Sequence, residues 1–239
     1  MRRFVIALVV SALAVSVSSA QIVIDTFSNT QTNILRTTVG STPVVQTDAS
    51  AIGGFRRVTN IYNSGAGNFD LIFNGSVMQS TADAGVLGSY LVEYGTQAQL
   101  NLNASATNAF QFERFFLDLS SGFTATITSG NGAVVATFTS SATAIPGGGA
   151  PSQLITVPFA SFTNGGLLNL ADIDAISFRF DAAQQATQFQ LDNIRFVTVS
   201  IPEPATIAMI GVTGSLVAGG MYLRRRRHQK KLNASFTRI

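Results

Sequence analysis

The sequence predicts an all-β fold, and three observations carry this prediction. The chain of 239 residues is rich in Phe and Gly, with 18 and 21 residues, and only 11% of its residues are charged. This composition favours strands over helices. Short runs that alternate apolar and polar residues recur through the middle of the chain, as half-buried strands require. No stretch of helical period reaches twelve residues there, which disfavours a parallel α/β fold with crossover helices.

The N-terminus predicts a secretory signal peptide over residues 1–20. Arg2 and Arg3 give it a charged start, and an apolar run follows over residues 4–17. The small residues Ser18 to Ala20 form the cleavage region. Small residues at positions −3 and −1 are typical of a signal-peptidase site. Cleavage there leaves Gln21 as the new N-terminus. The alternative is an uncleaved N-terminal anchor, which the small residues of the cleavage region disfavour.

Residues 21–200 predict a single jelly-roll or β-sandwich ectodomain. Eleven candidate strands fit this architecture: residues 22–27, 55–62, 69–73, 88–94, 99–103, 109–117, 123–128, 133–139, 153–157, 175–180 and 188–197. Asn131-Gly132 predicts a hairpin between two of them. A short turn or 3₁₀ piece is expected over residues 164–171, and a long loop over 144–151. The expected core consists of alternating rings at Phe110, Phe112, Phe178, Phe180 and Phe189.

The C-terminus predicts a membrane segment. Pro202 and Pro204 flank Glu203 and end the β pattern, because proline fits neither a helix interior nor a central strand. Residues 205–223 contain no charge, and 19 residues suit a helix that spans the hydrocarbon core. A basic cluster follows directly and predicts a stop-transfer flank that stays in the cytoplasm, namely Arg224, Arg225, Arg226 and Arg227. Residues 228–239 would then be a cytoplasmic tail.

This tripartite end, over residues 201–227, resembles the PEP-CTERM sorting signal of bacterial surface proteins. The resemblance rests on Pro202-Glu203-Pro204, on the apolar span and on the Arg cluster, which occur in that order. It implies recognition and processing by an exosortase, after anchoring in the inner membrane, and then release to the cell surface or extracellular matrix. The chain continues for twelve residues beyond the cluster, whereas such signals usually end soon after it. The alternative is an ordinary single-pass anchor.

The ectodomain resembles the galactose-binding-like group of carbohydrate-binding jelly rolls. The residues that carry this resemblance are Ile24-Asp25-Thr26-Phe27, Gly53-Gly54-Phe55-Arg56, Asp172-Ile173-Asp174-Ala175-Ile176 and Leu191-Asp192-Asn193-Ile194-Arg195. It implies that the last strand lies beside the first. It also implies a structural Ca²⁺ held by Asp25 and Asp192 with backbone carbonyls, since Ca²⁺ prefers six to eight oxygens. The alternative makes Asp25 a surface carboxylate and Asp192 a turn or capping residue.

Tyr90 and Tyr94 are the candidate ligand residues, because sugar-binding sites stack aromatic rings on the apolar sugar face. They share strand parity. The alternative is a pair of half-buried rings on a sandwich face. The shortage of aromatic residues suited to the surface, with no Trp in the chain, argues against a strong lectin.

No enzyme activity is expected. There is no Cys, and His228 is the only His, which leaves no thiol nucleophile and little scope for histidine catalysis. Asp172 and Asp174 read more simply as loop residues than as a catalytic pair. Glu93 and Glu113 lie mid-strand and could line a groove. No cofactor is expected beyond the Ca²⁺.

The charges divide by location. The formal net charge is +3, but two basic residues lie in the signal peptide and seven follow the apolar span. The exported part therefore carries six basic residues against all 12 acidic ones. With no basic patch, nucleic-acid binding is not expected. The leading hypothesis is an exported surface or matrix protein with a structural, adhesive or exopolysaccharide-associated role. The alternatives are a weak carbohydrate-binding module and, last, a polysaccharide-active enzyme.

Overall fold

The computed structural model describes residues 20–28, 32–141, 152–182 and 184–199. The chain divides into two units, residues 1–199 and 200–239, and the second lies wholly outside the described residues. The predicted signal peptide up to residue 19, the loop at 144–151, the apolar span and the basic cluster also lie outside them. Within the described residues, no helix is long and apolar enough to cross a membrane.

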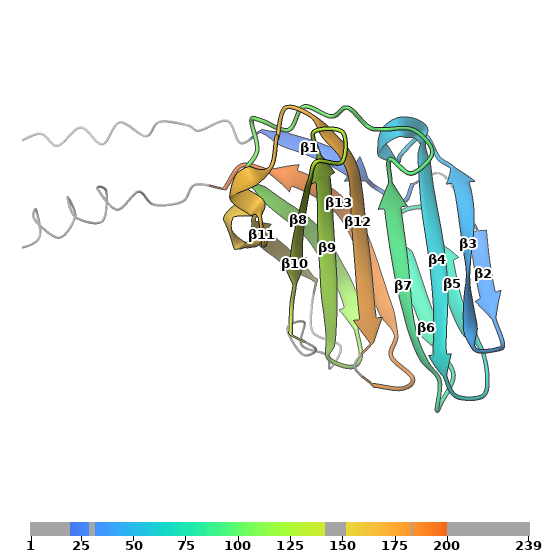
Figure 1. Cartoon of the computed structure of the whole chain (residues 1–239). Coiled ribbons are helices and arrows are strands. Elements are labelled where there is room, and N and C mark those ends of the chain that lie inside the picture. The colour runs from blue at the N-terminus through green and yellow to red at the C-terminus, as the bar shows by residue number, and fades with distance from the viewer. Residues whose placement is uncertain (1–19, 29–31, 142–151, 183, 200–239) are drawn as a thin grey trace, which may run out of the picture. The chain divides into compact units, whose positions relative to one another are not determined.

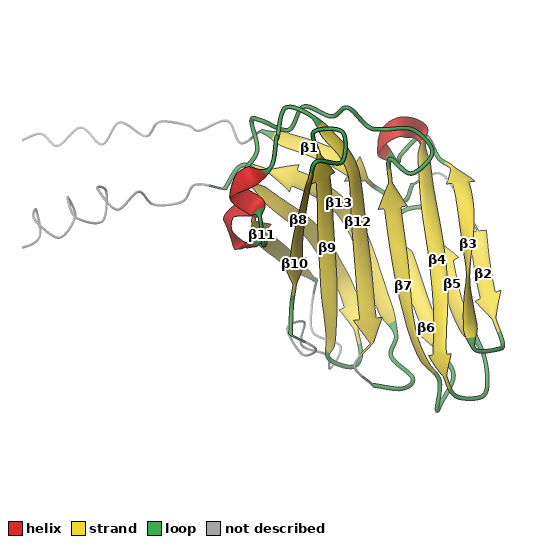
Figure 2. Cartoon of the chain, in the orientation of Figure 1, coloured by secondary structure: helices red, strands yellow, loops and turns green. Residues whose placement is uncertain are grey.

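The described part of the chain folds as a sandwich of two antiparallel sheets (Figures 1 and 2). The seven-stranded sheet has the order β11 (Gln153–Pro158), β8 (Ala109–Leu117), β13 (Phe189–Val197), β6 (Met78–Ala82), β5 (Phe69–Phe73) and β2 (Thr32–Arg36), with β1 (Gln21–Asp25) added to β13. The six-stranded sheet has the order β10 (Val134–Thr139), β9 (Ser121–Ser129), β12 (Ile173–Ala182), β7 (Leu87–Tyr94), β4 (Phe55–Ser64) and β3 (Gly40–Thr47). The described helices are 3₁₀ turns: η1 (Ile52–Gly54), η2 (Phe159–Ser161) and η3 (Gly165–Leu167). The all-β prediction is therefore confirmed.

Most predicted elements are present. The hairpin between β9 and β10 forms with Val134 opposite Ser129. Its four-residue loop has positive φ angles at Gly130, Asn131 and Gly132, a conformation that Gly and Asn adopt at low cost. The predicted 3₁₀ piece is η3.

Three strands were not predicted, and one predicted strand is wrong. The missed strands are β2, β3 and β6, which are rich in Thr, Ser and Asn and lack a clean apolar alternation. Two of them, β2 and β3, lie at sheet edges. Residues 99–103 do not form a strand: Asn101 takes a left-handed φ of 46°, and Leu102 forms an isolated β-bridge with Ile173.

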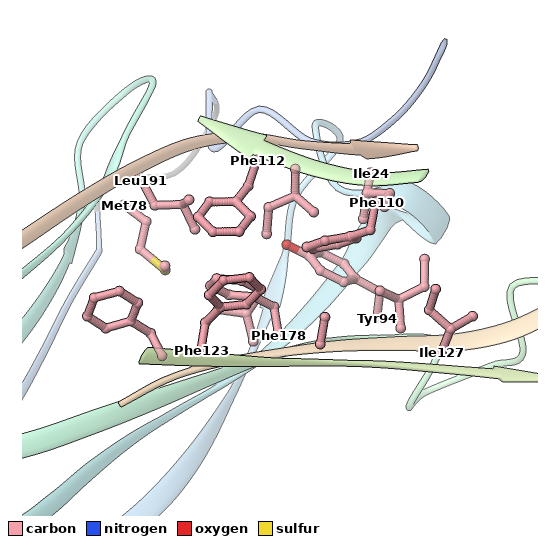
Figure 3. Close-up of a cluster of buried hydrophobic side chains, with 14 of the residues drawn as sticks. Ile24, Met78, Tyr94, Phe110, Phe112, Phe123, Ile127, Phe178 and Leu191 are labelled. Carbon is pink, nitrogen blue, oxygen red and sulfur yellow. The ribbon is translucent and has the colours of Figure 1, made fainter. Parts of the chain in front are cut away.

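Phenylalanine rings fill the space between the sheets, as predicted (Figure 3). Phe178 of the six-stranded sheet packs 4.8 Å from Phe112 of the other sheet, between ring centroids. Phe123 meets Phe112 edge-on at 4.9 Å. All five predicted core rings are buried. Burying such a ring contributes about 1.5–3 kcal/mol, which helps a domain of this size to fold without disulfides.

The first and last strands lie side by side, as the resemblance implied. Gln21 of β1 pairs with Val197 of β13, and the ladder shifts register between Val23 and Asp25. In Figure 1, β1 lies across the end of the sandwich where β13 finishes. The pairing places Asp25 opposite Ile194, close to Asp192 along β13.

Candidate functional site: the polar face of the seven-stranded sheet

The outer surface of the seven-stranded sheet carries a continuous set of polar side chains. Strand alternation produces it: Phe110 and Phe112 of β8 enter the core, so Gln111 and Glu113 lie on the outer side of the sheet, where Gln111 is 7% exposed and Glu113 half-buried. The same alternation on β13 sends Leu191 inward and Asp192 outward. We call this set the polar face; its members are Gln79, Gln111, Glu113, Thr156, Gln190, Asp192 and Arg195.

Side chains of the polar face are held by hydrogen bonds between neighbouring strands. Arg195 donates from Nε to the side-chain oxygen Oε1 of Gln111 at 2.6 Å. Gln111 in turn donates from Nε2 to the hydroxyl of Thr156 at 2.7 Å. Gln190 donates to Gln79 at 3.2 Å. These bonds leave planar amide and guanidinium groups fixed side by side, an arrangement able to hydrogen-bond the hydroxyls of a sugar.

Two carboxylates of the polar face lie on directly opposed residues, Glu113 of β8 and Asp192 of β13. Asp192 accepts hydrogen bonds from both the backbone and the side-chain nitrogen of Asn193, each at 2.7 Å. Partial burial is the main cause that raises the pKa of Asp192, and the negative charges of Glu113 and Asp25 add to it. The backbone hydrogen bond and Arg195 oppose this rise.

Asp25 lies on the other side of the sheet, in a buried ion-pair network. Its carboxylate accepts two hydrogen bonds from Arg56 Nη1, at 3.0 and 2.8 Å, and one from the Tyr94 hydroxyl at 2.9 Å. The backbone N–H of Phe27 donates to it at 2.7 Å. Arg56 also pairs with Asp48 at 2.6 Å. The rings of Phe27 and Phe73 lie 5.3 and 4.4 Å from the guanidinium carbon.

These contacts bear on the calcium hypothesis. Both oxygens of Asp25 are engaged by Arg56, so a divalent ion at this carboxylate would have to displace a guanidinium that already neutralises it. No group of three or more His, Cys, Asp or Glu side chains among the described residues is placed to share a metal. As arranged, Asp25 does not fit a calcium ligand. Asp192 is the member of the predicted pair that reaches the outer surface, and its role toward Ca²⁺ stays a prediction.

Tyr90 and Tyr94 share a face, as predicted, but that face is the core. Their exposed fractions are 1% and 0%, so neither ring can stack on a sugar, and this part of the site prediction is wrong. Tyr90 stacks on Phe180 at 5.3 Å, and Tyr94 lies among the apolar side chains of Figure 3. Burial, and next the charge of Asp25, raises the pKa of the Tyr94 hydroxyl well above its ordinary value.

The other acidic residues considered from the sequence make structural contacts. Glu93 accepts two hydrogen bonds from Arg57, at 2.7 and 2.6 Å, on the outer face of the six-stranded sheet. Asp174 is buried and accepts a hydrogen bond from the backbone of Gly132 at 2.9 Å. The backbone carbonyl of Asp172 accepts from Gly130 at 3.1 Å. Asp172 and Asp174 thus contact the β9–β10 turn. Asp172 precedes β12 as a loop residue, whereas Asp174 lies inside β12 and is buried.

Sequence reasoning did not identify the role of Arg56. A signal was present, because Arg56 shares strand parity with Val58, which is buried, and not with the half-exposed Arg57. A basic residue on the core-facing parity of a strand requires a buried acid. The partners come from β1 and from the segment after β3, which only the fold brings together.

Comparisons with known proteins give two findings. The PEP-CTERM protein-sorting motif matches residues 200–227. Solved structures similar to the chain include a family 11 carbohydrate-binding module from Clostridium thermocellum, in complex with a β-1,3-1,4-mixed-linked tetrasaccharide. It is 18% identical, with a TM-score of 0.39, over 75% of this chain and 96% of that one. The solution structure of CtCBM11 is 18% identical, with a TM-score of 0.41, over 78% and 99%.

A family 29 carbohydrate-binding module is 10% identical, with a TM-score of 0.35, over 77% of this chain and 99% of that one. No curated protein matches the chain. The matched motif contains Pro202, Glu203 and Pro204 and extends to Arg227, so it covers the sorting residues predicted from the sequence. The chain therefore carries a PEP-CTERM protein-sorting motif at residues 200–227, which indicates an exported protein sorted to the cell surface.

Proposed function

We propose that this protein is exported by its signal peptide, anchored in the inner membrane by residues 205–223, and processed by an exosortase-type enzyme at or near Pro202-Glu203-Pro204. Its sandwich then serves the cell surface or the extracellular matrix, in association with exopolysaccharide. The observation that carries this proposal is the sorting motif, which begins directly after the last residues held by the folded domain. Processing there would release the sandwich intact.

The polar face is the surface that we assign to the polysaccharide. It combines amide, carboxylate, hydroxyl and guanidinium groups in fixed positions, which suits repeated hydrogen bonds to sugar hydroxyls. None of the side chains described on this face is aromatic. The contacts that these groups offer are hydrogen bonds, each of them weak, so useful attachment would arise from many copies acting on one long polymer.

A polysaccharide-active enzyme remains the third candidate, and one observation bears on it. Glu113 and Asp192 are opposed carboxylates on an outer face, and the pKa of Asp192 is raised. Glycosidases use a pair of carboxyl groups. However, a described groove of 390 Å³ is lined by β2 and β3, and neither Glu113 nor Asp192 lines it. We therefore assign the polar face to binding.

Mass spectrometry of the protein isolated from its native cells tests the sorting proposal. We expect a mature N-terminus at Gln21 and a mature C-terminus near Pro204. An intact Ile239 would show that the chain is only anchored and would overturn processing.

Retention on exopolysaccharide from the same cells tests the binding proposal. We expect measurable retention of the protein, and a loss of retention in the variant Arg195→Ala, because this guanidinium belongs to the polar face. Arg179→Ala is the matched control: Arg179 is a half-exposed arginine on the opposite sheet, paired with Asp181. Equal retention of both variants and the parent would reject the polar face as the contact. No retention of the parent would favour a purely structural role.

A further inference from the structure

The two ends of the folded domain leave it at the same corner. Thr198 donates its backbone N–H to the carbonyl of Ala20 at 3.0 Å. The side chain of Asn108 makes two hydrogen bonds to Val199, the last described residue. Its Nδ2 donates to the Val199 carbonyl, and its Oδ1 accepts from the Val199 N–H, each at 2.8 Å. The fold therefore fixes the chain up to Val199, immediately before the sorting motif.

Few residues connect this corner to the predicted membrane span. Five residues, 200–204, separate Val199 from Ala205, where the uncharged span begins. A fully extended chain covers at most about 3.3–3.6 Å per residue, so this connection reaches about 20 Å. If residues 205–223 cross a bilayer, the corner at Val199 is held within that reach of the membrane surface.

Three loops surround this corner, and we call them together the junction end: residues 95–108, 130–133 and 159–172. Backbone hydrogen bonds join them, from Ala104 to Leu170 at 2.6 Å and from Gly130 to Asp172 at 3.1 Å. The same loops also fix the C-terminal end of the folded domain. Asn108, which binds Val199, accepts a hydrogen bond at its backbone carbonyl from the N–H of Phe159 at 2.8 Å.

The junction end is nearly free of charge. Its loops contain no Lys or Arg, and Asp172 is their one acidic residue. The loops at the opposite end of the sandwich, by contrast, carry Asp83 and Asp118. Residues 184–188 contact both loops: the backbone N–H of Gln188 donates to the Asp118 side chain at 2.7 Å, and that of Ala186 donates to the Val86 carbonyl at 2.8 Å. An acidic domain approaches anionic headgroups at least cost with its uncharged end.

An apolar side chain projects from this uncharged end. Leu167, at the end of η3, is 69% exposed and is the most exposed large apolar residue in the described part of the chain. Val135 is half-exposed nearby, since Asn164, three residues before Leu167, donates to the Val135 carbonyl at 3.2 Å. Leu168 and Leu170 pack inward on the core and hold the loop in place.

We propose that the junction end rests against the lipid headgroups while the chain is anchored, with Leu167 as its apolar contact. The opposite end then points away from the membrane, and the polar face, which runs along the strands between the two ends, stays uncovered. This inference rests on the membrane-anchored state of the proposed function. Its partner is the lipid surface itself, and not the processing enzyme.

A fluorescent label at position 167 tests the proposal. The chain contains no Cys, so Leu167→Cys offers a unique thiol for an environment-sensitive dye. Ala84→Cys is the matched control, because Ala84 is exposed in the loop between β6 and β7 at the opposite end. Each labelled full-length chain is reconstituted into vesicles of phosphatidylcholine and phosphatidylglycerol that contain a lipid spin-labelled at the headgroup. We expect loss of emission from the label at 167 and no loss from the label at 84.

Flotation of the same vesicles separates the two possible failures. A chain that floats, with equal emission from both labels, would overturn the inference and leave anchoring intact. A chain that does not float would overturn anchoring, and the inference with it. Quenching at 167 in vesicles that contain no other protein would show that lipid alone suffices as the partner.

Discussion

Arg56 and Asp25 form an ion pair with no exposed surface: Nη1 lies 2.8 Å from Oδ2, and both side chains are 0% exposed. The pair joins β4 of one sheet to β1 of the other. A second acid, Asp48, meets the same guanidinium at 2.6 Å. The first strand of the exported domain is thus fixed to the core by charge as well as by its ladder with β13.

Replacing Arg56 with Met should strongly destabilise the fold. The substitution leaves two carboxylates buried without their cation, and breaking such a pair costs about 3–5 kcal/mol. The measurement is the free energy of unfolding in urea. We expect a midpoint well below that of the parent, with the seven-stranded sheet losing the support of β1.

The neighbouring residue supplies the control. Arg57 pairs with Glu93 on the outer face, where the two side chains are 37% and 14% exposed. Arg57→Met should therefore cost only about 0–1 kcal/mol. If the two variants lose equal free energy of unfolding, then burial of the Arg56 ion pair is not the cause of its contribution to stability.

Gly88 should not tolerate a methyl group. An added Cβ would lie 2.3 Å from the nearest atom of the Phe69 ring, which is buried. Overpacking of this kind costs about 1–3 kcal/mol, so Gly88→Ala should lower the free energy of unfolding by that amount. Gly166→Ala is the control, because its Cβ would meet nothing within 4 Å. A neutral Gly88→Ala would mean that the Phe69 ring can move aside.

The sequence predicts the interior better than the edges. Alternation identifies β8, β12 and β13, because Phe110 and Phe112, Phe178 and Phe180, and Phe189 enter one core. The edge strand β3 contains Pro43 and polar residues, so its pairing with β4 depends on a neighbour and leaves no periodic signal. The sequence also could not predict that Tyr90 and Tyr94 point into the core. Strand parity shows that the two residues share a face, but it does not show which face of the strand is buried.

The candidate site shows the same division. Asp192 and Glu113 reach the outer surface through simple alternation, and both were candidates from the sequence. The partners of Asp25 come from residues 31 and 69 positions away along the chain. Pairings over such separations follow from the packing of the sheets, and spacing in one sequence cannot give them.

Removal of calcium should leave the melting temperature unchanged, because Arg56 already satisfies the Asp25 carboxylate. The test compares thermal unfolding of the full chain in chelator and in excess Ca²⁺. A rise in melting temperature with Ca²⁺ would contradict this expectation, since a ligand that binds only the native state stabilises it. The variant Asp192→Asn would then show whether the ion uses the outer carboxylate: the rise should disappear if it does.

Asp192 should make the fold less stable as the pH rises. Partial burial, with Glu113 and Asp25 nearby, raises the pKa of its carboxyl above the ordinary value of 3.8, so the native state holds the proton more tightly than the unfolded chain does. Stability then falls as the pH rises from about 3.8 through the raised pKa. The variant Asp192→Asn cannot titrate, so its free energy of unfolding relative to the parent should increase over this window and level off above it. Urea unfolding at a series of pH values measures the difference, and a constant difference would contradict the prediction. The variant Glu113→Gln adds a second test. Without the charge of Glu113, the pH-dependent difference in unfolding free energy between chains with and without Asp192→Asn should become smaller but persist, because burial is the larger cause of the raised pKa.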